Sequence, residues 1–366
     1  MHNQAGPGTQ GGSDDADPLP QIALIYNVVD EPRVGDASEL VADSEVMTTA
    51  RDIAEALRSL HYRVDLLPIR IEADLWASLG GYAPARTLVF NLCETLNGRA
   101  DDHPRVTEVL QALGLRFTGA SAHGLARCAD KARAKRVLRA HGVPTAPFQV
   151  CRTERVAVRV PLPAIVKPVA EDGSIGIGRD AVVTSRDGLR RRVAHVLESY
   201  RQPALVEEFI AGREFNVSIW GNGTAYVLPL TEQDFGDWPE LTRVVHFPAK
   251  WEADAPEYTG WISHCPAEVD EELAARIRAV ALQAYRLLGC KDYGRVDMRV
   301  KDGVPYVLEL NPNPCLAPDA GFATASRAAG YDYAHMLEQI VRWAWERPLP
   351  GRRVGALGRA RRTQNA

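Results

Sequence analysis

Residues 295–315 read R-V-D-M-R-V-K-D-G-V-P-Y-V-L-E-L-N-P-N-P-C and contain two runs of β-forming residues. The runs are separated by Asp302-Gly303, a dipeptide that favours the tight turn of a β-hairpin. The sequence therefore predicts two antiparallel strands joined by a two-residue turn.

Four polar side chains alternate along this predicted hairpin. Arg295 and Asp297 stand two residues apart on the first strand, and Glu309 and Asn311 do so on the second. Because alternate residues of a strand point to the same side, the hairpin brings both pairs onto one face. Asp297, Glu309 and Asn311 would then offer hard oxygen ligands suited to a Mg²⁺ shared with substrate phosphates, with Arg295 as a fixed cation beside them. The alternative is an ordinary amphipathic hairpin with a solvated charged face.

The composition is that of a soluble globular protein with two or three subdomains. The chain has 366 residues, of which 46% are hydrophobic and 25% charged, and its net charge is −4. This charge gives no indication of a nucleic-acid partner. No apolar run approaches the roughly 20 residues of a membrane-spanning helix, and the N-terminus lacks a signal-peptide pattern. Six cysteines occur singly, without C-x-x-C spacing. We therefore expect a cytoplasmic protein without membrane partners.

The first third of the chain alternates between strand and helix patterns. Residues 1–19 lack apolar periodicity and predict a disordered lead-in. Apolar runs and helical spacing then predict strands at 21–29, 62–68 and 87–92 and helices at 47–60 and 104–113. This order is typical of an open α/β layer. No G-x-G-x-x-G follows the first strand, so the sequence does not favour a dinucleotide site.

Polar residues follow two of these strands at the edge where open α/β sheets bind ligands. They are Asp30, Glu31 and Glu45 after the first strand, and Asn91, Cys93 and Glu94 after the third. Each is a candidate for binding a substrate amine. Helix capping and solvation are the alternatives for each of them.

Lys167 stands inside the apolar run A-I-V-K-P-V of residues 164–169. Because lysine is seldom buried without a partner, we expect an anion near it. Residues 171–179, E-D-G-S-I-G-I-G-R, place three glycines around Ser174. Glycines that let backbone N–H groups converge make a phosphate-binding loop, although a generic glycine-rich turn is the alternative.

The second half of the chain contains a segment with little periodicity and three helical patterns. Residues 231–266 include Lys250 and three tryptophans but show no regular spacing, which is typical of a functional lid. Helices are predicted at 188–200, 270–288 and 333–345, and residues 348–366 read as a disordered basic tail.

The order of these signals resembles that of the ATP-grasp superfamily, and within it the D-alanine–D-alanine ligase group. The signals are a lysine-bearing helix at 130–145, the I-V-K-P strand, the Gly/Ser loop, the V-E-E-F-I segment of residues 206–210, and then R-x-D and E-x-N. The resemblance covers residues 21–345. It implies α/β and α+β structure in three subdomains at 20–126, 127–204 and 205–347, with an open α/β N-terminal layer and ATP held between two α+β units.

The resemblance also implies ATP and Mg²⁺ as cofactors, with Mn²⁺ as an alternative metal. It implies phosphate contacts from Lys131, Lys167 and Lys250, a closing loop at Gly173 and Ser174, a base hinge at Glu207, Glu208, Phe209 and Ile210, a ribose ligand in Glu214, and metal ligands in Asp297, Glu309 and Asn311.

The chemistry implied is amide or peptide bond formation. ATP phosphorylates a carboxylate, and an amine displaces phosphate from the acyl phosphate. Phosphoryl transfer asks the protein mainly for positioning and charge neutralisation. The implied catalytic residues are Arg295, which would stabilise the oxyanion formed on amine attack, Lys250 and Ser174.

Departures from the family pattern concern the substrates. Gly173-Ser174 stands where the family has two serines, Trp251 where it has a tyrosine, and Asn313-Pro314-Cys315 departs from its N-x-x-P-G motif. We therefore expect a different substrate pair, such as an amino acid joined to another amino acid or to a specialised metabolite. The candidate substrate residues are Glu45, Glu94, Trp251 and Asn313. The alternatives are a true D-alanine–D-alanine ligase of cell-wall synthesis and an inactive ATP-binding scaffold. A homodimer is expected by family analogy alone.

Overall fold

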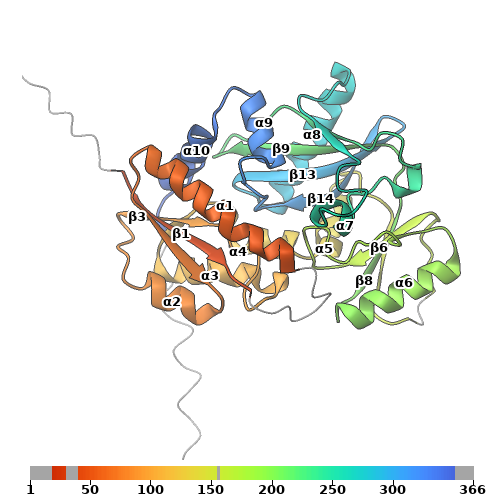
Figure 1. The fold of residues 1–366 in the computed structure, drawn as a ribbon, viewed down its shortest axis with the longest axis horizontal. Helices are drawn as coiled ribbons and strands as arrows, with labels where there is room; N and C mark the ends of the chain where they lie inside the picture. The colour runs from red at the N-terminus through yellow and green to blue at the C-terminus, as the bar shows by residue number, and fades with distance from the viewer. Residues whose placement is uncertain (1–18, 30–39, 155–156, 351–366) are drawn as a thin grey trace, which may run out of the picture.

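The computed structural model describes residues 19–29, 40–154 and 157–350, and its strands form three sheets. Figure 1 shows the N-terminal sheet on one side of the molecule and the other two sheets stacked beside it. The predicted combination of an α/β layer with two α+β units is thus confirmed. The predicted tails, Asp30 and Glu31 fall wholly or mainly outside the described residues.

The N-terminal sheet has the order β2-β1-β3-β4 and is parallel throughout. Its elements are β1 Gln21–Asn27, α1 Leu40–Ser59, β2 Val64–Ile69, α2 Glu72–Leu79, β3 Thr87–Asn91, η2 Ala100–Asp102, α3 His103–Leu113, β4 Arg116–Phe117 and α4 Ala122–Cys128. Ile22 and Leu24 pack in the core shared with α1, whereas Ala23 and Ile25 pack in the core shared with α2 and α3. Burial on both faces explains why β1 is an uninterrupted apolar run.

The second sheet has the order β5-β8-β6-β7 and is antiparallel. Its elements are α5 Lys131–Ala140, β5 Phe148–Cys151, β6 Ala164–Pro168, β7 Val182–Val183, α6 Arg186–Ser199 and β8 Ala204–Glu208. Asp130 caps α5 by accepting a hydrogen bond from the Arg133 N–H. Helix α6 covers one face of this sheet (Figure 1).

The third sheet has six strands, with the path β12-β11-β9-β13-β14 and β10 paired to β9. Its elements are β9 Arg213–Gly221, β10 Tyr226–Val227, β11 Thr231–Asp234, η3 Glu240–Thr242, α7 Phe247–Trp251, β12 Ile262–His264, α8 Glu271–Leu288, β13 Asp292–Lys301, β14 Val304–Asn311, α9 Gly321–Ala328 and α10 Tyr333–Glu346. The last helix packs against both this sheet and α1, in a core shared with the N-terminal layer.

The hairpin predicted from residues 295–315 is formed by β13 and β14. Asp297 pairs with Glu309 and Arg295 with Asn311, so the four polar residues lie directly opposite one another. The two-residue turn has φ of +51° at Asp302 and +71° at Gly303, the left-handed values that tight hairpins require.

The prediction that residues 231–266 lack regular structure is wrong. They contain two strands and two short helices, η3 and α7, and β11 is an internal strand of the third sheet. Thr231 and Gln233 are buried, and Gln233 donates a 2.8 Å hydrogen bond to the Asn216 side-chain oxygen. Because the buried face of β11 is polar, no apolar alternation marked it in the sequence. Within the described residues, no helix combines the length and apolar character needed to cross a bilayer.

Candidate functional site

A cavity of about 550 Å³ lies where the three sheets meet. Every predicted site residue other than Lys131 lines it: Glu45, Glu94, Lys167, Gly173, Ser174, Glu207, Glu208, Phe209, Ile210, Glu214, Lys250, Trp251, Arg295, Asp297, Glu309, Asn311 and Asn313. The fold therefore brings together residues that come from all three parts of the chain.

Asp297 is held at the cavity by three hydrogen-bonding side chains. Arg295 donates two hydrogen bonds to its carboxylate, at 2.7 Å to Oδ1 and 2.8 Å to Oδ2. Asn216 adds a 2.8 Å bond and Asn311 a 3.0 Å bond. The predicted cation beside the metal ligands is thus in place, and the carboxylate has a fixed orientation.

Glu309 faces Asp297 across the hairpin and approaches Lys131. Its Oε2 lies 3.3 Å from the Lys131 Nζ. Burial alone would raise the pKa of Glu309, but Lys131, Lys167 and Arg295 together hold it below its ordinary value. Glu309 is therefore ionised at neutral pH.

The two carboxylates and the Asn311 amide suit a hard ion that takes further oxygens from phosphates, as Mg²⁺ does. Among the described residues, no three His, Cys, Asp or Glu side chains cluster as a metal site. The predicted metal ligands include only two carboxylates, those of Asp297 and Glu309, so they do not form a group of three. An ion shared with phosphates would take its other oxygen ligands from the phosphates. The donor chemistry fits the predicted metal.

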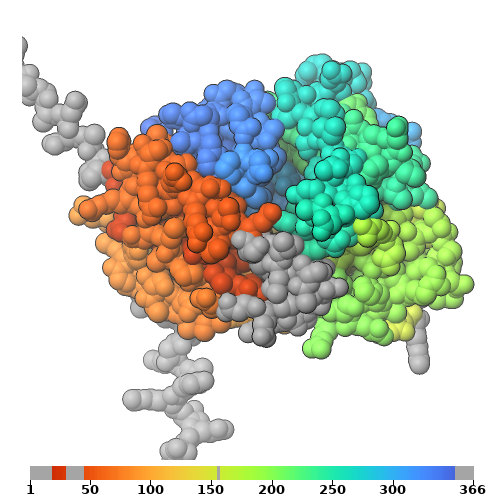
Figure 2. Space-filling view, in the orientation of Figure 1, coloured from red at the N-terminus to blue at the C-terminus, as the bar shows by residue number. Residues whose placement is uncertain are grey.

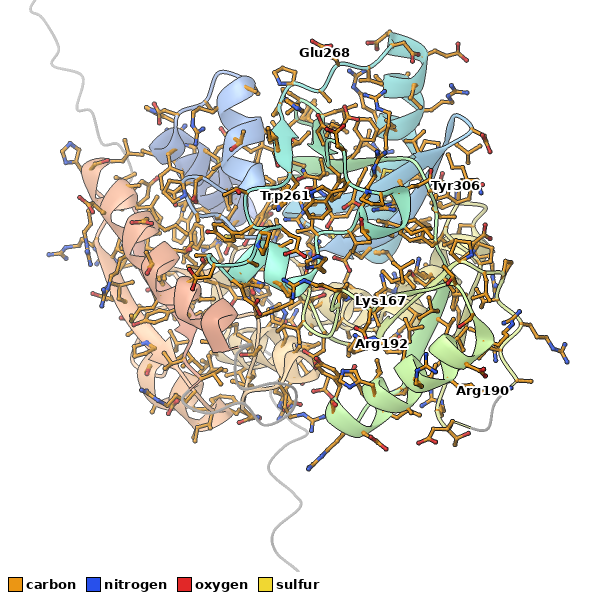
Figure 3. All side chains as sticks on the ribbon, turned by 45° about the vertical axis from the view of Figure 1, so that its right-hand side comes forward. Lys167, Arg190, Arg192, Trp261, Glu268 and Tyr306 are labelled. Atoms are coloured by element: carbon orange, nitrogen blue, oxygen red, sulfur yellow. The ribbon has the colours of Figure 1, made fainter. Side chains whose placement is uncertain are left out.

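The anion expected near Lys167 is Glu207. The Glu207 carboxylate is 1% exposed and lies 3.2 Å from the Lys167 Nζ and 2.9 Å from the Lys135 Nζ. Burial alone would raise its pKa, but the two ammonium groups hold it below its ordinary value. Figure 3 shows Lys167 in the interior between the two sheets, whereas Arg190 points outward from α6. The Glu207 side chain is therefore a counter-ion, and Glu207 lies within β8, which is paired with β5 and β6.

Lys135 was missed by the sequence prediction, which named Lys131 as the site residue of α5. Lys131 and Lys135 are buried, whereas the arginines of this helix face outward. The signal was present, because the two lysines are spaced i, i+4 and so share one helix face in a chain that otherwise uses mostly arginine.

Lys131 lies behind the cavity wall and is bound by the glycine-rich loop. Asp172 accepts a 2.8 Å hydrogen bond from its Nζ, and the Glu171 carbonyl accepts another. Together with Glu309, the loop thus surrounds the ammonium group with oxygen atoms. These are the contacts that a phosphate would replace.

Three hydrogen bonds join residues 173–177 of the glycine-rich loop to residues 245–251, and Arg179 of the loop also forms an ion pair with Glu257. The Ser174 hydroxyl donates to the Val245 carbonyl at 2.7 Å, the Trp251 indole N–H to the Gly173 carbonyl at 2.8 Å, and the Phe247 N–H to the Ile177 carbonyl at 2.8 Å. Figure 2 shows the blue-green segment around α7 lying against the light-green second sheet and its helix. We call these three contacts the loop–lid clasp.

The substrate candidates differ in how the structure uses them. Burial raises the pKa of Glu45, an effect that Lys250 partly offsets. The Asn313 amide accepts a 2.6 Å hydrogen bond from the Tyr293 hydroxyl and donates at 3.3 Å to the Cys93 carbonyl. Asn313 therefore ties β13 to the end of β3 while it lines the cavity.

Asn91 and Cys93, considered in the sequence for binding a substrate amine, do not line the cavity. Both are buried, and the Asn91 side-chain oxygen accepts a 3.1 Å hydrogen bond from the Cys93 N–H. They stabilise the end of β3 instead. Of the three candidates after this strand, Glu94 alone lines the cavity.

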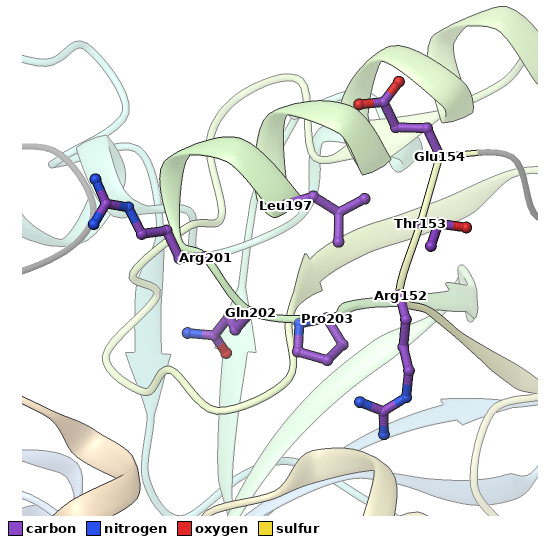
Figure 4. Close-up of a pocket in the computed structure, with 7 residues that line it drawn as sticks. All are labelled: Arg152, Thr153, Glu154, Leu197, Arg201, Gln202 and Pro203. Carbon is purple, nitrogen blue, oxygen red and sulfur yellow. The ribbon is translucent and has the colours of Figure 1, made fainter.

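A second hollow, of about 740 Å³, lies at the outer edge of the second sheet (Figure 4). It is lined by Arg152, Thr153, Glu154, Leu197, Arg201, Gln202 and Pro203. None of the predicted site residues contributes to it. We therefore assign the functional site to the cavity between the sheets.

The family model "D-ala D-ala ligase C-terminus" matches residues 137–342. The D-alanine–D-alanine ligase of Desulforudis audaxviator is 30% identical over 320 residues, which are 84% of this chain and 96% of that protein. The chain belongs to the D-alanine–D-alanine ligase family. The ligase of Marinomonas sp. is 32% identical over 81% of this chain and 89% of its own. The protein y4sG of Sinorhizobium fredii is 34% identical over 70% of this chain and 75% of its own.

A solved structure supports the same fold for this D-alanine–D-alanine ligase family member. The D-alanine–D-alanine ligase of Bacillus anthracis, solved as a complex with ATP, superposes with a TM-score of 0.68 at 22% identity, covering 89% of this chain and 97% of that one. The sequence prediction of an ATP-grasp ligase, an ADP-forming enzyme that makes carbon–nitrogen bonds, is confirmed by this membership. ATP and Mg²⁺, the predicted cofactors, are those of the family.

Proposed function

We propose that this enzyme joins the carboxylate of an amino acid to an amine other than that of a second D-alanine. The observation that carries the proposal is the contact between Trp251 and the Gly173 carbonyl. The resemblance implies side chains of serine and tyrosine at this junction, where they orient the first amino acid. In this protein the Trp251 indole N–H instead donates to the main-chain carbonyl of Gly173. The first substrate would therefore contact different side chains here.

When bound, ATP would supply the phosphoryl group that activates the carboxylate, and Mg²⁺ would neutralise the charge that develops. Lys131, Lys167 and Lys250 would hold the phosphates, and Asp297, Glu309 and Asn311 the metal. Arg295, fixed by its two bonds to Asp297, would stabilise the oxyanion that forms as the amine attacks. The loop–lid clasp would exclude water from the activated acid.

The amine subsite is proposed at Glu45 and Glu94. Both line the cavity from the N-terminal unit, and each lies near Lys250. A carboxylate there would hold the ammonium form of an amino acid by a charge-assisted hydrogen bond. The predicted roles of these two residues rest on this placement.

A phosphate-release screen tests the proposal. ATP, Mg²⁺ and pairs of amino acids, with D-alanine included, are supplied to the purified enzyme, and phosphate is measured. We expect the best pair to exceed D-alanine alone by at least about tenfold, or about 1.4 kcal/mol of transition-state stabilisation. Equal or faster turnover with D-alanine would establish the second candidate, a true D-alanine–D-alanine ligase, which the relatives' own names favour.

The Glu309→Ala variant tests the metal assignment and the scaffold alternative. Loss of one of two carboxylate ligands should reduce ADP formation by at least about 100-fold while the melting temperature stays near that of the wild type. Glu271→Ala is the control, because Glu271 is an exposed residue of α8 that pairs with Arg278. Unchanged ADP formation in Glu309→Ala would refute the metal role, and an inactive wild type would favour a scaffold.

A further inference from the structure

Arg299 is a buried arginine of the cavity that the sequence analysis did not single out. It stands on β13 two residues beyond Asp297, so its side chain points to the same face of the sheet. It is 3% exposed and lines the cavity. A buried guanidinium requires several hydrogen-bond acceptors, and the acceptors that Arg299 has indicate its role.

The first acceptor is Glu214. The Arg299 Nε lies 2.9 Å and the terminal nitrogen 2.8 Å from the same oxygen, Oε2 of Glu214. In the part of the chain that the structure describes, no hydrogen bond or ion pair involves the other oxygen, Oε1. Arg299 therefore fixes the carboxylate from one side and leaves an oxygen free to accept from a ligand's hydroxyl groups.

The other contacts of Arg299 join two further segments. Its second terminal nitrogen donates a 3.1 Å hydrogen bond to the Ile210 carbonyl, and the guanidinium lies 4.7 Å from the centre of the Phe209 ring. It also donates to the Arg243 carbonyl, in the segment that leads to α7. One planar group thus connects Phe209-Ile210, Glu214 and the lid.

We infer that Arg299 is a positioning residue for the nucleoside end of the nucleotide. The inference rests on the proposed use of ATP, in which Phe209-Ile210 borders the base and Glu214 binds the ribose. The geometry assigns to Arg299 the task of holding these two elements at a constant separation before the ligand arrives. Such pre-organisation improves affinity because less ordering remains to be done on binding.

The test compares ATP with inorganic triphosphate, which lacks the nucleoside. In the wild type, ATP should bind more tightly than triphosphate. In Arg299→Met, we expect ATP affinity to fall by about tenfold or more, while triphosphate affinity stays within about twofold. Arg299→Lys, which keeps the charge but cannot form the planar fork, should give an intermediate loss for ATP alone. Binding is measured by isothermal titration calorimetry.

Arg213→Met is the matched control. Arg213 also makes two bonds to one carboxylate, that of Glu232, donates to a main-chain carbonyl and stacks on a ring, but it does not line the cavity. Its loss should leave the ratio of ATP to triphosphate affinity unchanged.

Three outcomes would overturn the inference. They are unchanged ATP affinity in a folded Arg299→Met variant, an equal loss of ATP and triphosphate affinity, and a changed ratio in the Arg213→Met control. If Arg299→Met does not fold, Arg299→Lys decides by the same ratio. A wild type that binds ATP no better than triphosphate would instead refute the proposed use of ATP.

Discussion

Single charged residues of this enzyme are buried with opposite charges, and these contacts set their ionisation. Lys135 is 1% exposed and lies 2.9 Å from Glu207, while Lys167 lies on the other side of the same carboxylate. Removing Lys135 would leave the buried Glu207 carboxylate with Lys167 as its remaining ammonium partner, and losing a close buried contact of this kind costs more than losing a surface pair. The residue scale is therefore where substitutions should have their largest effects on stability.

Lys135→Met should lower the free energy of unfolding by about 1 to 3 kcal/mol, measured by urea denaturation at pH 7, because Glu207 loses one of its two ammonium partners. The folded pKa of Glu207 lies below its ordinary value, so its ionised form stabilises the protein at neutral pH and loses that contribution as pH falls. Without Lys135 this pKa should rise, and acid unfolding should begin at a higher pH. Lys301→Met is the control, because the Lys301–Glu208 pair is wider, at 3.9 Å, and only partly buried. Equal losses in both variants would contradict the argument.

Asp172→Asn should tighten ATP binding by about threefold to tenfold. Asp172 is half exposed and forms a 2.8 Å ion pair with Lys131, the predicted phosphate ligand. A carboxylate at this position competes with the triphosphate for the same ammonium group. The dissociation constant for ATP measures the effect, and Asp187→Asn, on the exposed face of α6, serves as the control. Weaker ATP binding in Asp172→Asn would mean that the carboxylate supports the ligand instead of competing with it.

At the scale of elements, the loop between β6 and β7 and the segment around α7 act as one cover. Gly173 and Ser174 both have positive φ, +63° and +67°, a conformation that is costly for serine. The loop–lid clasp holds this backbone in place by three hydrogen bonds. Opening the cavity requires these bonds to break together.

Trp251→Phe should loosen this cover. Phenylalanine keeps an aromatic ring but lacks the indole N–H that donates a hydrogen bond to the Gly173 carbonyl. We expect faster proteolysis within residues 171–179 and more phosphate released from ATP and acid without amine, because water reaches the activated acid. Trp345→Phe, on α10 beneath Arg116, is the control. Loss of amide formation without any rise in amine-independent phosphate release would argue against the water-excluding role.

On the scale of the whole molecule, Asp292 joins the N-terminal layer to the third sheet and the C-terminal helix. It begins β13, accepts a 2.8 Å hydrogen bond from the Gly119 N–H and lies 3.1 Å from the Arg347 guanidinium. Burial raises its pKa to about 6, although Arg347 and Gly119 oppose the rise.

The subdomain boundaries, the homodimer, the cytoplasmic location and the identity of the substrates stay predictions.

Asp292→Asn should change the pH dependence of stability with a defined sign. Since the folded pKa lies above the unfolded value near 4, the folded state binds more protons between pH 4 and about 6, and this residue's contribution falls as pH rises. The fall amounts to about 3 kcal/mol across this window and should be absent in the variant. Denaturant titrations at pH 4, 5, 6 and 7 measure it. Asp332→Asn should show the opposite sign, because hydrogen bonding from the His335 N–H lowers the pKa of Asp332. A stability difference between wild type and Asp292→Asn that does not vary with pH would contradict the prediction.

The amino-acid sequence by itself determined many of the elements and the polar face that is predicted to bind metal. Apolar periodicity, Asp130 as a helix cap and the Asp302-Gly303 turn act over a few residues, so the strands of the N-terminal sheet, α5 and the β13–β14 hairpin could be predicted. Alternation along that hairpin was enough to place Asp297, Glu309 and Asn311 together, because strand geometry is local.

Only the tertiary structure decided which distant groups meet. Lys135 pairs with Glu207, and Arg299 contacts Glu214 and Phe209-Ile210. Trp251, which follows the third sheet's β11 in the chain, donates to the Gly173 carbonyl in a loop of the second sheet. No local pattern encodes these pairs, because each depends on how separate sheets pack. The polar strand β11 escaped prediction for the same reason, since its buried face is satisfied by Asn216 on a neighbouring strand and not by an apolar core.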